Sequence, residues 1–194
     1  MEDKRVLVIH PDDRSTDFLK LIYKDKDYDV INFKGSDNSS GISLLYEDPD
    51  YCYCKVLETI DLYDKIILLG HGTPGGLLNP KAGGYLVDDA AADILRKKEV
   101  VSVWCFSDKF FRGNNIFNNQ FHTGMIISET LEQLIMLGRI YLDNKQQLKN
   151  MEKFATIIGE CIEDTPENMK KHVLENYIGE DPVTQFNRDN ILVF

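Results

Sequence analysis

Short apolar runs recur along this chain, and their spacing constrains its fold more than any other feature. Val6–His10, Lys65–Gly70 and Val100–Cys105 are continuous runs that lack the alternation of a half-exposed strand. Such runs are typical of strands buried on both faces of a parallel sheet. Segments with a helical spacing of apolar residues separate them. The sequence therefore predicts an α/β fold, a three-layer α/β/α sandwich with a mostly parallel sheet.

Turn-forming residues and apolar periodicity locate the remaining elements. The segment from Gly41 to Leu62 is expected to contain a helix that Pro49 interrupts. With 194 residues and no repeat or linker, the chain is expected to form one domain, residues 1–194. The other expected elements are a helix in Asp12–Lys24, a strand at Tyr28–Phe33, a hairpin within Leu77–Val87, a helix from Asp88 to Lys98, a loop at Phe106–Gln120, a strand at Gly124–Ser128, helices at Glu129–Leu142, Lys145–Glu163 and Pro166–Tyr177, and a closing strand at Ile191–Phe194.

Charge and cysteine content narrow the classes of partner. The chain has 22 Lys and Arg against 32 Asp and Glu, a net charge of −10 that opposes binding to a phosphate backbone. We therefore expect no nucleic-acid partner. No apolar run approaches the roughly 20 residues of a membrane span, and the first residues lack a secretory signal pattern, so no membrane association is expected. Read with that expectation, the four cysteines predict reduced thiols and a cytoplasmic location.

Two of the predicted strands end on residues that suit thiol chemistry. His71 follows the run Lys65–Gly70, and Cys105 ends the run Val100–Cys105. In parallel sheets ligands bind beyond the carboxyl ends of the strands, and neighbouring strand ends lie about 5 Å apart. An imidazole at that distance lowers the pKa of a thiol and can hand a proton to a leaving amine. The N–H groups of Gly72 and Cys105 are expected to form an oxyanion hole.

These motifs resemble the clan CD cysteine peptidases, which include caspases, metacaspases, legumain, clostripain, gingipains and separase. The matching segments are Asp64–Gly72, which ends in His-Gly, and Val100–Cys105, with a hairpin and a helix expected between them. The resemblance extends loosely to a fifth strand, trailing helices and a closing strand. It implies a caspase-like fold, His71 as general base and acid, Cys105 as nucleophile through a thioester acyl-enzyme, and a peptide or protein substrate.

The loop after the first strand supplies candidates for substrate specificity. An aspartate at Asp12 or Asp13 would select Arg or Lys at P1, whereas Arg14 would select Asp. A helix cap with acidic first-turn residues explains the same pattern equally well. Two acids against one base favour a basic P1 residue. Ser128, at the end of the predicted fifth strand, is a further candidate for binding substrate.

Other readings of the chain stay open. Trp104 and Phe106 are bulky neighbours for a nucleophile, which favours a catalytically inactive caspase-like binding or regulatory module as one alternative. A flavodoxin-like domain that binds a small anion or nucleotide at the same strand ends is another. The Cys52-Tyr-Cys54 pair lacks two further ligands of suitable spacing, so no metal is expected. No cofactor is expected either, and the oligomeric state is left open.

Overall fold

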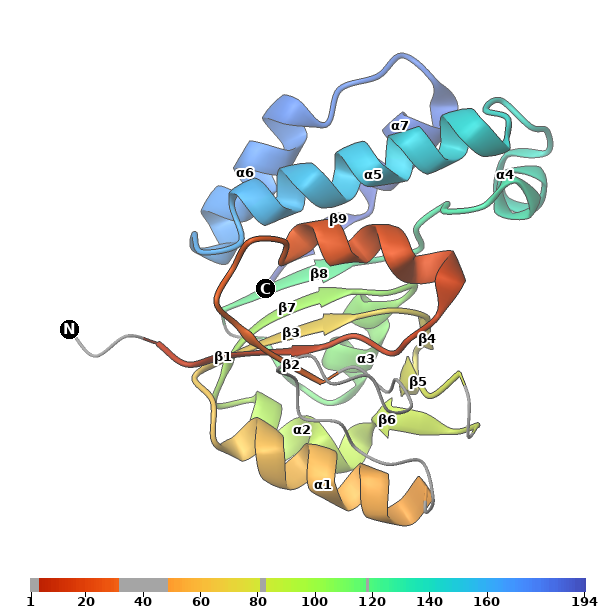
Figure 1. The fold of residues 1–194 in the computed structure, drawn as a ribbon. Helices are drawn as coiled ribbons and strands as arrows, with labels where there is room; N and C mark the ends of the chain where they lie inside the picture. Colours follow the sequence, from red (N-terminus) through yellow and green to blue (C-terminus); the bar gives the residue numbers. More distant parts are fainter. Residues whose placement is uncertain (1–3, 32–48, 81–82, 118) are drawn as a thin grey trace.

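A six-stranded sheet forms the centre of the protein (Figure 1). The structure is a computed structural model that describes residues 4–31, 49–80, 83–117 and 119–194, with the side chains of 49–53 excepted. The strands lie in the order β2–β1–β3–β7–β8–β9, all parallel except β9, which runs antiparallel to β8. Their bounds are β1 Val6–Ile9, β2 Asp29–Ile31, β3 Lys65–Leu69, β7 Glu99–Val103, β8 Gln120–Thr123 and β9 Ile191–Val193.

Helices cover both faces of this sheet, which confirms the predicted three-layer α/β/α arrangement (Figure 1). One face is covered by α1 Pro49–Asp61, α2 Ala92–Leu95, preceded by the 3₁₀ turn η2 Asp89–Ala91, and α3 Ser107–Gly113. The other face is covered by the 3₁₀ helix η1 Arg14–Ile22, α5 Asn144–Glu160 and α6 Pro166–Asn176. Two further helices, α4 Thr130–Leu137 and α7 Pro182–Asp189, lie beside α5.

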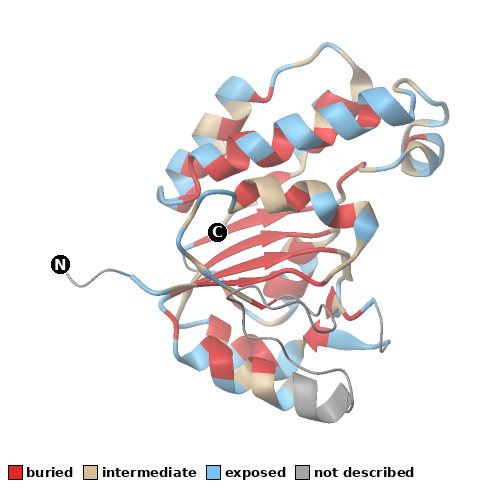
Figure 2. Ribbon diagram, in the orientation of Figure 1, coloured by how far each residue is buried: buried red, intermediate tan, exposed pale blue. Residues whose placement is uncertain are grey.

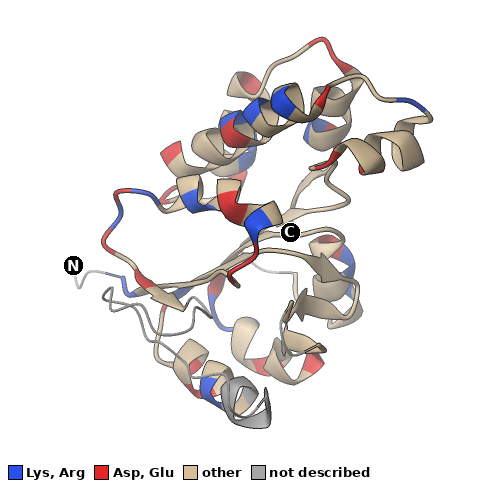
Figure 3. Ribbon diagram, turned by 45° about the vertical axis from the view of Figure 1, so that its right-hand side comes forward, with Lys and Arg blue, Asp and Glu red and all other residues tan. Residues whose placement is uncertain are grey.

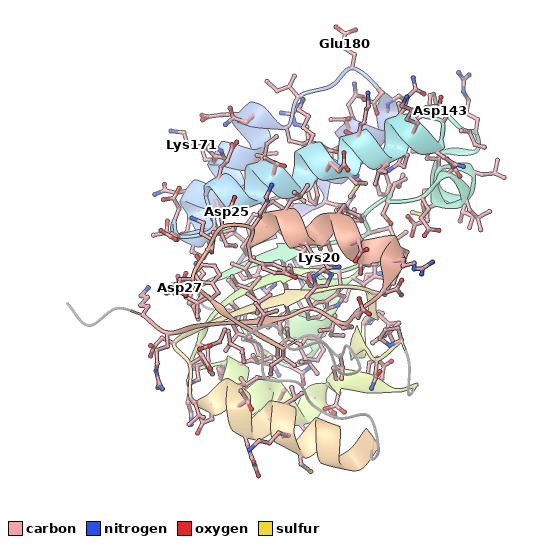
Figure 4. The ribbon with its side chains drawn as sticks, in the orientation of Figure 1. Lys20, Asp25, Asp27, Asp143, Lys171 and Glu180 are labelled. Atoms are coloured by element: carbon pink, nitrogen blue, oxygen red, sulfur yellow. The ribbon has the colours of Figure 1, made fainter. Side chains whose placement is uncertain are left out.

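The two cores follow from the period of a strand, because successive side chains point to opposite faces. Val8 and Ile67 face the layer of η1, α5 and α6, whereas Leu7 and Ile66 face the layer of α1, α2 and α3. All four are fully buried, and Figure 2 shows the strands buried along most of their length. Each side chain of this size contributes about 1.5–3 kcal/mol when buried. Charged residues lie mainly on the helices and loops, as Figure 3 and the labelled side chains of Figure 4 show.

A small second sheet follows β3. The predicted hairpin is present, with β5 Gly76–Leu78 antiparallel to β6 Tyr85–Val87, and a third strand, β4 Gly72–Thr73, pairs with β5. The left-handed Gly83 and Gly84 lie in the turn between β5 and β6. This sheet contacts α1 and α3 and begins with the glycine that follows His71.

The fifth strand lies earlier in the chain than predicted. Gln120–Thr123 forms β8, whereas Gly124–Ser128 follows the strand without pairing in the sheet. Polar Gln120 and His122 made this segment a poor strand candidate, yet both are fully buried. His122 is accommodated by a 2.7 Å hydrogen bond between its Nδ1 and Ser102 Oγ. The imidazole thus has a buried partner from another strand that the sequence pattern could not reveal.

Three other predicted elements are corrected. Pro49 begins helix α1 rather than interrupting it, since the first turn of a helix does not need the missing N–H. The predicted loop Phe106–Gln120 contains the short helix α3. The predicted helix Glu129–Leu142 ends sooner, at Leu137, because Gly138 takes a left-handed conformation there. Residues 41–48 and 32–33 of the predicted elements lie outside the described residues.

Several helices fall close to their predicted bounds. Asn144–Glu160 and Pro166–Asn176 correspond to the last two predicted helices, and β9 is the expected closing strand. Helix α7 was not predicted, although Asp181 caps it by accepting a hydrogen bond from Thr184 N, with Pro182 in its first turn. Within the described residues, no helix combines the length and the apolar character that crossing a membrane requires.

Candidate active site

His71 and Cys105 lie just beyond the carboxyl ends of two paired strands. The last registered pair of β3 and β7 is Leu69 with Val103, and each candidate residue follows its strand by two positions. Gly70 N donates a 3.2 Å hydrogen bond to Val103 O, which extends the pairing by one step. The sequence predicts Cys105 as the last residue of the strand, whereas in the structure it lies in a turn after the strand. Both side chains line one small cavity of about 30 Å³.

Glycines on both sides of His71 are required by close packing. Gly70 has a φ of +143°, a conformation that L side chains rarely adopt. A Cβ at Gly72 would lie 2.1 Å from Trp104 Cδ1, so only glycine fits against this ring. Trp104 is buried in the core, packs on Phe110 and Phe111 of α3, and is also among the residues that line the cavity. The oxyanion role predicted for Gly72 and Cys105 stays a prediction, because packing alone explains the glycine.

The imidazole of His71 is hydrogen-bonded to a serine that the sequence analysis did not select. Ser15 Oγ lies 2.7 Å from His71 Nε2 and 2.7 Å from Asp13 Oδ1. Asp13 Oδ2 is 3.9 Å from the same imidazole nitrogen. A hydroxyl has one hydrogen to donate, and an ionised carboxylate only accepts. The serine therefore donates to Asp13 and accepts from His71 Nε2–H, which leaves Nδ1 as the basic nitrogen.

The carboxylate of Asp13 is held in its charged form. Partial burial alone would raise its pKa, but hydrogen bonds from the Ser15 hydroxyl and backbone N–H, together with the nearby His71, bring the pKa below its usual value. Ser15 N donates to Asp13 Oδ1 at 2.9 Å, so the carboxylate also caps η1. The residue thus fulfils the capping interpretation and orients the histidine through Ser15.

The thiol of Cys105 is protonated in this arrangement. Burial raises its pKa to about 11, and the carboxylate of Glu132 acts in the same direction. Its Sγ donates to the backbone carbonyl of Ile126 at 3.5 Å. A thiol of this pKa is not the reactive thiolate at neutral pH. His71 and Cys105 are therefore each bonded to another group in the absence of substrate.

Backbone strain lies immediately after the candidate nucleophile. Phe106 has a φ of +67°, which is rare for a bulky residue and costs about 1–3 kcal/mol. Its ring lies 4.3 Å from Lys109 Nζ, in cation–π contact. Phe106 is the N-cap of α3, so this left-handed residue lies between Cys105 and the start of the helix. Strain of this kind persists only where the surrounding structure enforces it.

A second, larger cavity of about 280 Å³ adjoins the first. The two share Phe18, Ser128 and Met151 in their linings, and the substrate-binding role of Ser128 stays a prediction. Among the described residues that line it, Glu129 is the only charged side chain. Asp13 instead faces Ser15 and His71, and neither Asp12 nor Asp13 is among the described residues that line the two cavities. The remaining lining residues are Ser15, Thr130, Asn144, Gln147 and Leu148.

The buried His10 has structural hydrogen-bond partners on both ring nitrogens. His10 Nδ1 lies 3.0 Å from the hydroxyl of Tyr23, and its Nε2 lies 3.4 Å from Thr16 Oγ1. Burial lowers the pKa of His10 to about 4.

A sequence signal could have identified Ser15. In Asp13-Arg14-Ser15 an acidic residue stands two positions before a serine at the start of a helix.

The cysteine pair considered as a metal ligand set lies on a helix rather than a strand. Cys54 is exposed on α1, and the side chain of Cys52 is outside the described residues. Within the part of the chain that the structure describes, no three His, Cys, Asp or Glu side chains gather as a metal site.

Comparisons with known proteins do not assign this chain to a family. No protein-family model matches the chain, and no curated protein matches it. Among solved structures, the chain is similar to the Trp repressor binding protein from Bacillus subtilis at 11% sequence identity and a TM-score of 0.34. That likeness covers 77% of this chain and 98% of the other. It is too slight to bear on the fold or the function of this protein.

Proposed function

We propose that this protein is a cysteine endopeptidase with Cys105 as nucleophile and His71 as general base. The observation that carries the proposal is the pairing of β3 with β7, after which both residues line one cavity. The order of elements supports the resemblance to clan CD peptidases. Strand β3, with His-Gly just beyond its end, is followed by a small hairpin, a helix and a strand that leads to cysteine.

The reaction begins with the loss of one hydrogen bond, that of the Cys105 thiol. The thiol leaves the Ile126 carbonyl, and His71 Nδ1 takes its proton, so that the thiolate attacks the scissile carbonyl carbon. The C–N bond then breaks as the imidazolium gives its proton to the leaving amine, which leaves a thioester on Cys105. His71 next removes a proton from water, which hydrolyses the thioester and restores the thiol. Ser15 and Asp13 hold the imidazole ring during both transfers.

The second cavity supports a P1 residue that is basic. It opens beside the first cavity through Ser128, and the one charged side chain among its described lining residues is the carboxylate of Glu129. Polar groups of Thr130 and Asn144 provide further hydrogen-bond partners there. A Lys or Arg side chain would supply the missing positive charge, whereas an acidic side chain would be repelled.

A panel of fluorogenic peptides that differ at P1 tests this proposal. We expect turnover with Arg or Lys at P1 and none with Asp. Cys105→Ala should abolish turnover, whereas the exposed thiol variant Cys54→Ala should retain it. Turnover that survives Cys105→Ala would exclude Cys105 as the nucleophile.

A second candidate function is a caspase-like module that binds a partner without catalysis. The observation that favours it is the high pKa of Cys105, about 11, together with the engagement of His71 by Ser15. A peptide that carries an electrophile in place of the scissile bond separates the two. Covalent labelling of Cys105 requires a base that reaches the thiol, so labelling supports the peptidase and its absence supports the binding module.

An anion- or nucleotide-binding function is less well supported. In flavodoxin-like sheets the ligand lies at the strand ends near β1, with its phosphate against a helix N-terminus. Here the carboxylate of Asp13 already accepts the N–H at the start of η1. A phosphate would have to displace this carboxylate and would meet the negative charge of Asp12 beside it. Copurification of a flavin or nucleotide would favour this third candidate.

A further inference from the structure

Helix α4 has its polar and apolar faces reversed relative to an ordinary surface helix. Its buried side chain is Gln133, whose amide is fully hydrogen-bonded. Gln133 Oε1 accepts from the backbone N–H of Tyr141 and Leu142 at 2.8 and 2.9 Å, and its Nε2 donates to Leu142 O and Gln147 Oε1, both at 2.9 Å. A polar side chain, rather than an apolar stripe, therefore attaches this helix to the fold.

The opposite face of α4 is apolar and exposed. Leu131, Leu134 and Ile135 are 61%, 49% and 70% exposed and form one stripe at helical spacing, which we call the α4 stripe. Ile140, which follows the helix, and Leu148 on α5 are also exposed apolar residues. In Figure 2 this helix is largely exposed, and in Figure 3 its ribbon is almost wholly uncharged, whereas α5 beside it carries both signs. Adjoining exposed apolar residues of this size mark an interaction surface.

We propose that the α4 stripe is the contact between two copies of this chain, packed antiparallel about a two-fold axis. Every copy carries the same apolar stripe, which is the self-complementary surface that a two-fold contact needs. Charge favours the antiparallel direction. The helix begins next to Glu129 with Glu132 in its first turn, and Arg139 follows its end. Antiparallel packing places the acidic start of each helix against the basic end of the other, and it also opposes the helix dipoles.

The contact is expected to be weak. A stable interface buries about 800 Å² on each partner, more than one short helix and two neighbouring side chains supply. The association should therefore depend on protein concentration in the micromolar range. It does not depend on the peptidase proposal. Thr130, the first residue of α4, nevertheless lines the second cavity, so a partner on this helix would lie near that cavity.

Sedimentation velocity over a wide range of protein concentration tests the proposal. We expect the full chain to shift from monomer to dimer as concentration rises, and Ile135→Glu to raise the dissociation constant at least about a hundredfold, because a two-fold contact contains each substitution twice. Leu62→Glu is the matched control, since Leu62 is 57% exposed and follows α1 on the other side of the sheet (Figure 1). A monomer at every concentration, or a dimer that Ile135→Glu leaves intact, would overturn the proposal.

Cross-linking tests the two-fold geometry itself. In a Cys54→Ser background, Ile135→Cys should form a cross-linked dimer with a short bis-maleimide, because the centre of the stripe lies nearest the axis. Leu62→Cys in the same background should remain a monomer. Equal cross-linking of both variants would contradict the proposal. Binding of the wild type to neutral phosphatidylcholine vesicles as a monomer would assign the stripe to a lipid surface instead and would also overturn it.

Discussion

The two edges of the central sheet carry polar groups in opposite arrangements. At the amino edge, Lys65 Nζ donates at 2.5 Å to both Glu99 Oε1 and the carbonyl of Ile162, and Lys4 Nζ donates to Glu99 Oε2 at 2.8 Å. At the carboxyl edge, Cys105 is bonded to a backbone carbonyl, and His71 is bonded to a serine hydroxyl. Charges therefore neutralise each other at one edge, whereas at the other the proposed nucleophile and base are each bonded to a different group.

The larger cavity lies at the amino edge of the sheet, away from His71 and Cys105. The amino edge has a cavity of about 310 Å³, lined by Lys4, Lys65, Glu99 and Glu163, whereas the cavity beside Cys105 is about 30 Å³. The larger cavity is surrounded by ion pairs that already satisfy one another. Because the charged groups around the larger cavity are paired with one another, whereas His71 and Cys105 are held only by neutral hydrogen-bond partners, the comparison is consistent with placing the proposed active site at the smaller cavity.

The largest expected effect is at the amino edge. Glu99→Gln removes the carboxylate beside Lys65, whose side chain is only 4% exposed, and should lower the free energy of unfolding by about 3–5 kcal/mol because a buried ammonium loses its partner. Urea denaturation measures this. Glu58→Gln, which breaks an exposed pair with Lys55, should change it by no more than about 0.5 kcal/mol. Equal effects of the two changes would contradict a structural role for Glu99.

Acid should destabilise the carboxyl edge through His10. Its folded pKa is about 4, lowered chiefly by burial, against about 6.5 in the unfolded chain. Between these values the unfolded state binds a proton that the folded state does not. The stability is therefore full above pH 6.5 and falls by about 3 kcal/mol as the pH drops to 4. His10→Asn should flatten this part of the profile in urea titrations at several pH values, and an unchanged slope would show that other groups cause it.

The reactivity of Cys105 tests the separation of nucleophile and base. With a pKa of about 11, roughly one thiol in a thousand is ionised at pH 8. Without substrate, iodoacetamide should alkylate Cys105 at least about a hundredfold more slowly than the exposed Cys54, as read by peptide mass spectrometry. Equal rates would mean that the thiol is already activated in the resting protein.

The smallest predicted effect concerns Ser15. Ser15→Ala removes the hydroxyl that holds His71 Nε2 and should lower kcat about tenfold on the best peptide with little change in KM, since the ring loses its orientation. Ser15→Thr keeps the hydroxyl and should restore most of the rate. The pH–rate profile should also shift in Ser15→Ala but not in Ser15→Thr. Identical profiles for the two variants would remove Ser15 from the positioning of His71.

Much of the fold was predictable because strand periodicity and burial are local signals. The continuous runs Val6–His10 and Lys65–Gly70 became adjacent buried strands, and the hairpin after His71 was marked by its glycines. The shift of the fifth strand to Gln120–Thr123 was not predictable, because the partner that makes His122 tolerable is Ser102 on another strand.

The candidate site also has a part that the sequence predicted and a part that only the structure revealed. The sequence by itself determined that His71 and Cys105 each follow a buried strand and favoured the pairing of these strands, which the structure confirms. Only the tertiary structure decided that Ser15, 56 residues away from His71, holds its imidazole, and that the Ile126 carbonyl holds the thiol. Those bonds depend on the positions of backbone and side chains from separate loops. A hydrogen bond requires atoms to lie within about 3 Å in a fixed direction, and no sequence spacing sets that geometry.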